Sequence, residues 1–144
     1  MTRQFVRQLL LDEAFAYGFT IAFWGSGVLL IRAFGLPGTP GVFAYALGAV
    51  SGFAVLAALT FGSATQVIET DTAPEYVLLS AIHYLAALVP IAATHVLVTA
   101  PLPRLATFFL SGGAVSTLYN LSATVEELLS ERLRQTEQRF GEDS

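Results

Sequence analysis

Four long apolar runs dominate this sequence and constrain its fold more than any other feature. They lie near residues 14–34, 41–63, 76–100 and 105–125. The first two runs and the turn between them contain one charged residue, Arg32, and the last two with their turn contain only Arg104. An α-helix needs about 20 apolar residues to cross a hydrocarbon core roughly 30 Å thick. We therefore expect an all-α fold, an integral membrane four-helix bundle with short loops.

The composition agrees with a single transmembrane domain over residues 1–144. Apolar residues make up 54% of the 144 residues, and charged residues make up 12%. A chain of this length cannot bury so much apolar surface in a water-soluble core, because small domains leave much of their surface exposed. The lipid bilayer is therefore the expected partner of that surface.

Several function classes are disfavoured by what the chain lacks. Without cysteine there are no disulfides, thiolate metal sites or thiol redox chemistry. No P-loop or zinc-protease motif is present, and the acidic residues gather in the tails and one loop, which argues against nucleic acid. His83 and His95 stand about 120° apart on a helix, so they do not share a face for haem. Ser26 lies between two glycines, with only His95 as a base at its depth. We expect no enzyme activity, and no catalytic, cofactor-binding or metal-binding residues.

The arginines predict the orientation in the membrane. Five of the seven lie in the tails, and positive residues beside spans favour the cytoplasm. Both termini of this multi-pass cell-membrane protein are therefore expected to be cytoplasmic. Residues 35–41 contain three Gly and two Pro, which predicts a tight turn and packed first and second helices.

The helical pattern continues beyond Val125, so the fourth helix is expected to extend into the cytoplasm over residues 126–140. One side of this tail is apolar and the rest is charged. A helix of this length is marginal in water by itself, so the stripe predicts a partner surface. The expected self-association residues are Leu128, Leu129, Leu133 and Phe140.

Polar residues within the spans are candidates for a pathway or for a bundle core. The full candidate set is Asp12, Glu13, Ser80, His83, Ser116 and Asn120. The two members in the third span share an inward-facing stripe with Ala87, Pro90 and Thr94. Either these groups line an ion or proton path, or His83 hydrogen-bonds Asn120 or a hydroxyl to hold the bundle while the two acids are solvated.

Gly48 and Gly52 have the spacing that lets two helix backbones approach closely, so they are candidates for helix packing.

Two functions remain open from the sequence. The first is a homo-oligomeric channel or small transporter for an ion or small solute, its path lined by the polar stripes or by the interface between copies. The alternative is a non-catalytic membrane anchor or assembly subunit that acts on a cytoplasmic protein partner through its C-terminal helix. A transporter should bring Asp12 or Glu13 near His83, whereas an anchor should combine a well-packed bundle with an exposed apolar stripe on the tail.

Overall fold

The protein is described by a computed structural model that covers residues 2–61 and 77–142, with side chains for residues 16–59, 85–125, 128, 129 and 132. These ranges contain four helices and no strand, which confirms the all-helical prediction. The helices are α1 (Thr2–Phe34), α2 (Thr39–Phe61), α3 (Val77–Thr99) and α4 (Arg104–Glu142).

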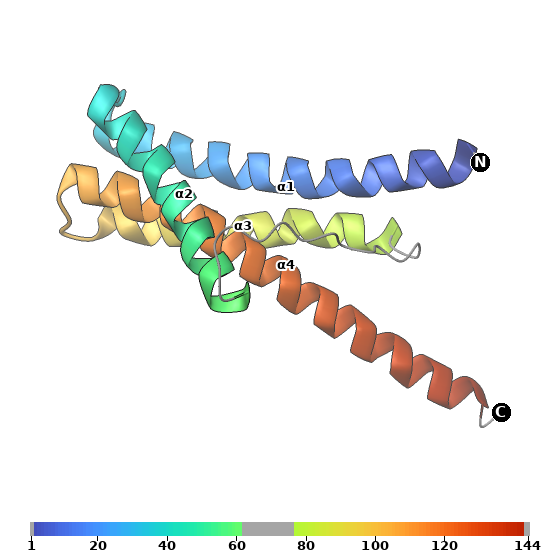
Figure 1. Ribbon diagram of the computed structural model, residues 1–144. Helices are drawn as coiled ribbons and strands as arrows, with labels where there is room; N and C mark the ends of the chain where they lie inside the picture. The colour runs from blue at the N-terminus through green and yellow to red at the C-terminus, as the bar shows by residue number, and fades with distance from the viewer. Residues whose placement is uncertain (1, 62–76, 143–144) are drawn as a thin grey trace.

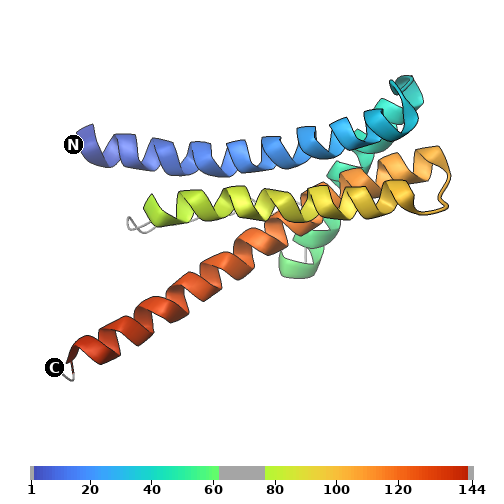
Figure 2. The ribbon, with the colours of Figure 1, turned by 180° about the vertical axis from the view of Figure 1, so that it is seen from behind.

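The α1–α2 turn and the α3–α4 turn lie at the same end of the structure. Figures 1 and 2 show α1 and α3 side by side and running in the same direction, while α4 runs back and diverges from them. The start of α1 and the end of α4 therefore lie at the end opposite to the two turns (Figure 1). With 33 and 39 residues, α1 and α4 both exceed the length of about 20 residues that a single span needs.

The turn between α1 and α2 is closed by glycine. Gly35 has a φ of 75°, a left-handed conformation that other residues rarely adopt, and its N–H donates to the Ile31 carbonyl oxygen at 2.8 Å. The N–H groups of Gly41 and Val42 donate to the Gly38 carbonyl oxygen at 2.9 and 3.2 Å, which starts α2. The chain thus reverses within residues 35–38.

Glycines form the crossing of α2 and α4. A Cβ atom on Gly48 would meet the Phe109 carbonyl oxygen, and one on Gly112 would meet the Tyr45 carbonyl oxygen. A Cβ atom on Gly52 would lie 2.7 Å from the Gly113 carbonyl oxygen. The two backbones are therefore in direct contact, and this closeness requires residues without side chains.

The short first turn predicted that the first and second helices pack against each other, but the helices are paired differently in the structure. Within the described ranges, α2 lies against α4, and α1 lies against α3, whereas the α1 and α2 backbones do not approach each other. The glycine crossing explains the difference, because it draws α2 across α4. In the described residues, Tyr45 of α2 reaches α1, and its ring centroid lies 4.6 Å from that of Phe23.

Two of the described helical segments are long and apolar enough to cross a membrane. They are Ala16–Phe34, with 19 residues, and Thr39–Leu59, with 21 residues. Only 22% and 11% of their apolar windows are buried inside the structure, so most of their side chains point away from the other helices. A shorter apolar helical segment covers Leu85–Thr99.

Candidate functional site: a buried hydroxyl cluster between the helices

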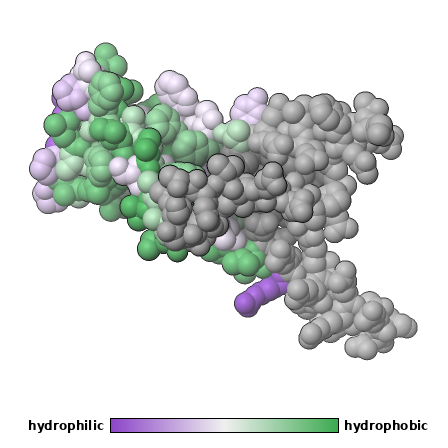
Figure 3. All heavy atoms as spheres, viewed as in Figure 1, coloured by the Kyte–Doolittle hydropathy of each residue, from purple (hydrophilic) through white to green (hydrophobic). Residues whose placement is uncertain are grey.

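Five hydroxyl side chains are buried between the helices beside apolar core residues such as Leu30 and Tyr119, while many other large apolar side chains face outward. The buried hydroxyl residues among those described are Ser26, Thr94, Thr107, Ser111 and Ser116. By contrast, Val50 and Leu59 of α2 are 66% and 80% exposed. Figure 3 shows apolar side chains over much of the described part of one face, with more polar side chains at the turn end, along the upper edge and at one position at the lower right. Hydroxyl groups are therefore buried between helices whose outer faces are largely apolar.

Ser26 of α1 lies where three helices meet. Its hydroxyl donates to the Pro90 carbonyl oxygen of α3 at 3.5 Å. The Tyr45 hydroxyl of α2 donates to the Phe23 carbonyl oxygen of α1 at 2.6 Å and lies within hydrogen-bonding reach of Ser26. Pro90 has no N–H, so the Ala86 carbonyl lacks its usual donor from this turn of the helix. Polar groups at this level therefore connect α2, α1 and α3.

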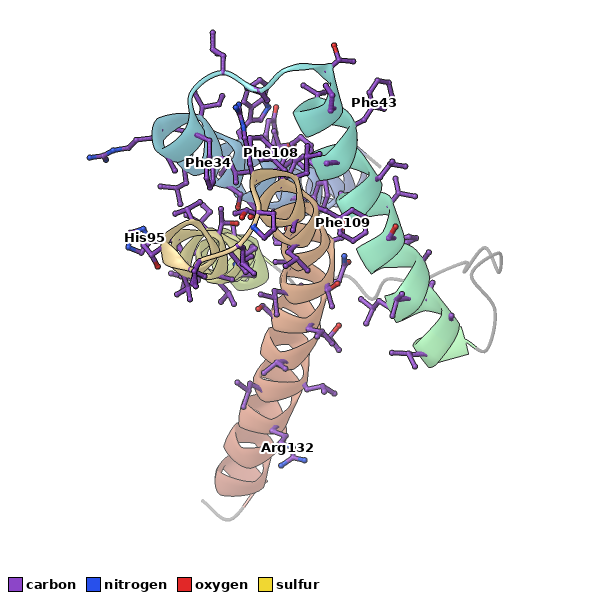
Figure 4. The ribbon with its side chains drawn as sticks, turned by 90° about the vertical axis from the view of Figure 1, so that its left-hand side faces the viewer. Phe34, Phe43, His95, Phe108, Phe109 and Arg132 are labelled. Carbon is purple, nitrogen blue, oxygen red and sulfur yellow. The ribbon has the colours of Figure 1, made fainter. Side chains whose placement is uncertain are left out.

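Aromatic contacts bound this polar region on both sides. Towards the turns, the rings of Phe34 and Phe108 have centroids 6.0 Å apart, and Figure 4 shows them between α1 and α4. Towards the chain ends, Phe19 meets Tyr119 edge to face with centroids 5.7 Å apart. Along α1 and α4, Ser26, Ser111 and Ser116 thus lie between these two aromatic contacts.

Two of the predicted site residues lie together on α4. Ser116 is buried, and the Asn120 side-chain amide donates to the Ser116 carbonyl oxygen at 2.6 Å. The Thr124 hydroxyl in turn donates to the Asn120 carbonyl oxygen at 2.8 Å. Each of these bonds stays within one helix. They satisfy polar groups of α4 locally, as is common for such side chains in helices.

The remaining members of the predicted polar set are placed only by their backbones. Asp12 and Glu13 lie in α1, and Ser80 and His83 lie in α3, but their side chains fall outside the described residues. The proposed bond between His83 and Asn120 therefore stays a prediction.

The stripe predicted on the third span does face the other helices where it is described. Ala87, Pro90 and Thr94 are all buried, in agreement with that prediction. Sequence reasoning did not single out Ser111, and it considered Ser26 only as a nucleophile. Each of these serines stands next to glycine in an apolar run, and that local pattern was the available signal for an inward-facing hydroxyl.

At the end of the structure that carries the turns, Arg104 contacts the α1–α2 turn. The Arg104 guanidinium donates to the Leu36 carbonyl oxygen at 3.0 Å, and its central carbon lies 5.8 Å from the centre of the Phe108 ring. This interaction joins the α1–α2 turn to the start of α4. His95 points outward from α3 in Figure 4 and is exposed, away from the buried cluster.

The extension of α4 carries exposed apolar side chains. Leu128 and Leu129 are 55% and 56% exposed, and Val125 one turn earlier is also exposed. Figures 1 and 2 show this part of α4 standing apart from the other helices. The side chains of Leu133 and Phe140 fall outside the described residues.

The chemistry of the buried cluster is that of neutral hydrogen bonding. Hydroxyl groups donate and accept hydrogen bonds without carrying a charge. Across the described part of the chain, no group of three or more His, Cys, Asp or Glu side chains is placed to hold a metal ion.

Comparison with known proteins gives no relative on which to base a function. No protein-family model, curated protein or solved structure matches this chain significantly. The function must therefore be inferred from the geometry.

Proposed function

We propose that this chain is an integral membrane protein whose four helices cross the bilayer. The main support is the large number of apolar side chains on the outside, such as Trp24, Val50 and Leu59, which are 67%, 66% and 80% exposed although the helices have a packed core. In water such an arrangement would leave many apolar side chains solvated, whereas lipid is a favourable environment for them. The low burial of the apolar α2 also supports the proposal, because the core helix of a soluble protein is mostly buried.

In the bilayer, the protein acts as an assembly subunit that associates with further copies of itself through the cytoplasmic extension of α4. The observation that carries this proposal is the exposure of Leu128 and Leu129 on a helix that extends away from the others. Fully burying a leucine contributes on the order of 1.5 to 3 kcal/mol, so covering these two half-exposed side chains favours a helix–helix contact. The role is non-catalytic.

A test of this proposal uses the double variant Leu128→Glu/Leu129→Glu. It places two charges on the apolar stripe, so the mass of the purified oligomer in mild detergent should fall to that of the monomer. Gln138→Glu adds a charge away from the stripe and serves as the control, with no expected change in mass. Native mass spectrometry measures both. A monomeric wild type, or an oligomer unaffected by the double variant, would contradict the proposal.

A second function, a channel or small transporter built from the same oligomer, is favoured by one observation. The hydroxyls of Ser26, Thr94 and Ser111 lie in the interior of the helix assembly, where a polar path would run. Ion or solute flux through purified protein in liposomes distinguishes the two functions. An assembly subunit gives no flux above that of empty liposomes, and a channel gives flux that depends on the protein.

A further inference from the structure

Thr94 and Ser111 stand out among the buried hydroxyls because neither has a hydrogen-bond partner among the described residues. Both are 0% exposed. A buried hydroxyl left without a partner destabilises a protein, because it gives up its hydrogen bonds to water and gains none in return. Their arrangement therefore needs an explanation.

Other hydroxyls in the same structure bond within their own helix. Those of Thr20, Thr107 and Thr124 donate to the carbonyl oxygen four residues earlier, at 2.8, 3.2 and 2.8 Å. Thr94 and Ser111 do not use this route, so their buried hydroxyls lack the partner that a helix can supply. At Thr94, the carbonyl four residues earlier belongs to Pro90, which already accepts a bond from Ser26.

The two hydroxyls lie at the same level of the structure. The contact of Ser26 with Pro90 places these two residues at the same height along α1 and α3. Because α1 and α3 run in the same direction, Leu30 and Thr94, one helical turn later, also lie at the same height. The contact of Phe34 with Phe108 fixes α1 against the antiparallel α4. Leu30, about one turn before Phe34 in α1, and Ser111, about one turn after Phe108 in α4, therefore lie at the same height.

We propose that Thr94 and Ser111 together hold one buried water molecule beside Leu30, between α1, α3 and α4. Water can donate two hydrogen bonds and accept two, so it can satisfy both hydroxyls at once. A neutral molecule fits because the charged side chains described at the turn end, Arg32 and Arg104, are exposed. An ion at this level would be separated from water without a counter-charge.

The test combines a double-mutant cycle with infrared spectroscopy on the full-length protein in detergent. Thr94→Val and Ser111→Ala should each lower the thermal unfolding midpoint by about 5 °C. The double variant should lower it by no more than one single variant does, because both partners of the water are then removed together. Thr20→Val, which removes an exposed hydroxyl bonded to its own helix, is the matched control and should leave the midpoint nearly unchanged.

Infrared spectroscopy detects the bound water directly. Wild type and Thr94→Ser, which keeps the hydroxyl, should share an O–H stretching band that shifts in ¹⁸O-labelled water. That band should be missing from Thr94→Val and from Ser111→Ala. Additive midpoint shifts would overturn the proposal, because the hydroxyls would then act independently. Coupled shifts with an unchanged set of water bands would also overturn it, because the two hydroxyls would then bond each other directly. Either single variant that folds is sufficient for the spectroscopic comparison.

Discussion

At the scale of single residues, the structure depends most visibly on positions that lack a side chain. Gly112 lies against the backbone of α2, whereas Gly27 of α1 has nothing within 4 Å of the place where a Cβ atom would stand. The same substitution at these two glycines therefore has opposite structural consequences. This contrast allows a matched comparison between two glycine-to-alanine variants.

Gly112→Ala should destabilise the protein by about 1–3 kcal/mol, because the new methyl group would force α2 away from α4. Gly27→Ala should be neutral or stabilising by up to about 1 kcal/mol, because alanine favours the helix. Thermal unfolding in detergent, followed by circular dichroism, measures both variants. A Gly112→Ala protein as stable as wild type would mean that α2 and α4 do not cross at this point.

At the scale of helices, Tyr45 provides a polar contact between α2 and α1. Its hydroxyl donates to the Phe23 carbonyl oxygen, and its ring packs on the Phe23 ring. Since α2 otherwise lies on α4, this side chain fixes the position of α2 relative to the rest of the structure. The ring contact and the hydrogen bond can be separated by substitution.

Tyr45→Phe keeps the ring and removes the hydroxyl, so it should lower the free energy of unfolding by about 1 kcal/mol. The exposed Tyr17 supplies the control, and Tyr17→Phe should have no measurable effect. Chemical or thermal unfolding of the two variants side by side provides the measurement. Equal stability of Tyr45→Phe and wild type would show that the ring alone positions α2.

The sequence predicts the helices better than it predicts their partners. Runs of apolar residues and the glycines and prolines between them locate the helix ends beside both turns to within a few residues, because these signals are local. The first helix, however, begins at Thr2, well before the apolar run that starts near residue 14. The crossing of α2 over α4 depends on glycines that are distant in the chain, at positions 48 and 112. No local pattern in a single sequence indicates which of the other three helices such glycines face.

The buried cluster was predictable only in part, for a similar reason. The third-helix stripe through Thr94 follows from helical periodicity alone. Ser26 and Ser111 become part of a cluster only when α1 and α4 are placed around α3, which requires the tertiary structure. The predicted acidic and histidine members of the polar set belong to side chains outside the described residues.

At the scale of the whole molecule, the start of α1 and the end of α4 lie opposite to the α1–α2 and α3–α4 turns (Figure 1). Such an arrangement suits a protein whose helices cross the bilayer and whose termini share the cytoplasmic side. The five tail arginines support that orientation. The 39-residue α4 is long enough to cross the bilayer and still project from it.

The most direct test of the central claim is cysteine labelling in intact cells, which the lack of native cysteine makes clean. One variant carries Leu36→Cys in the α1–α2 turn, where the side chain is 82% exposed. The other carries a cysteine appended after Ser144. We predict that a membrane-impermeant maleimide labels the Leu36→Cys variant in intact cells and labels the appended cysteine only after permeabilisation. Labelling of the two cysteines from the same side, or release of the protein from membranes by alkaline washing, would contradict it.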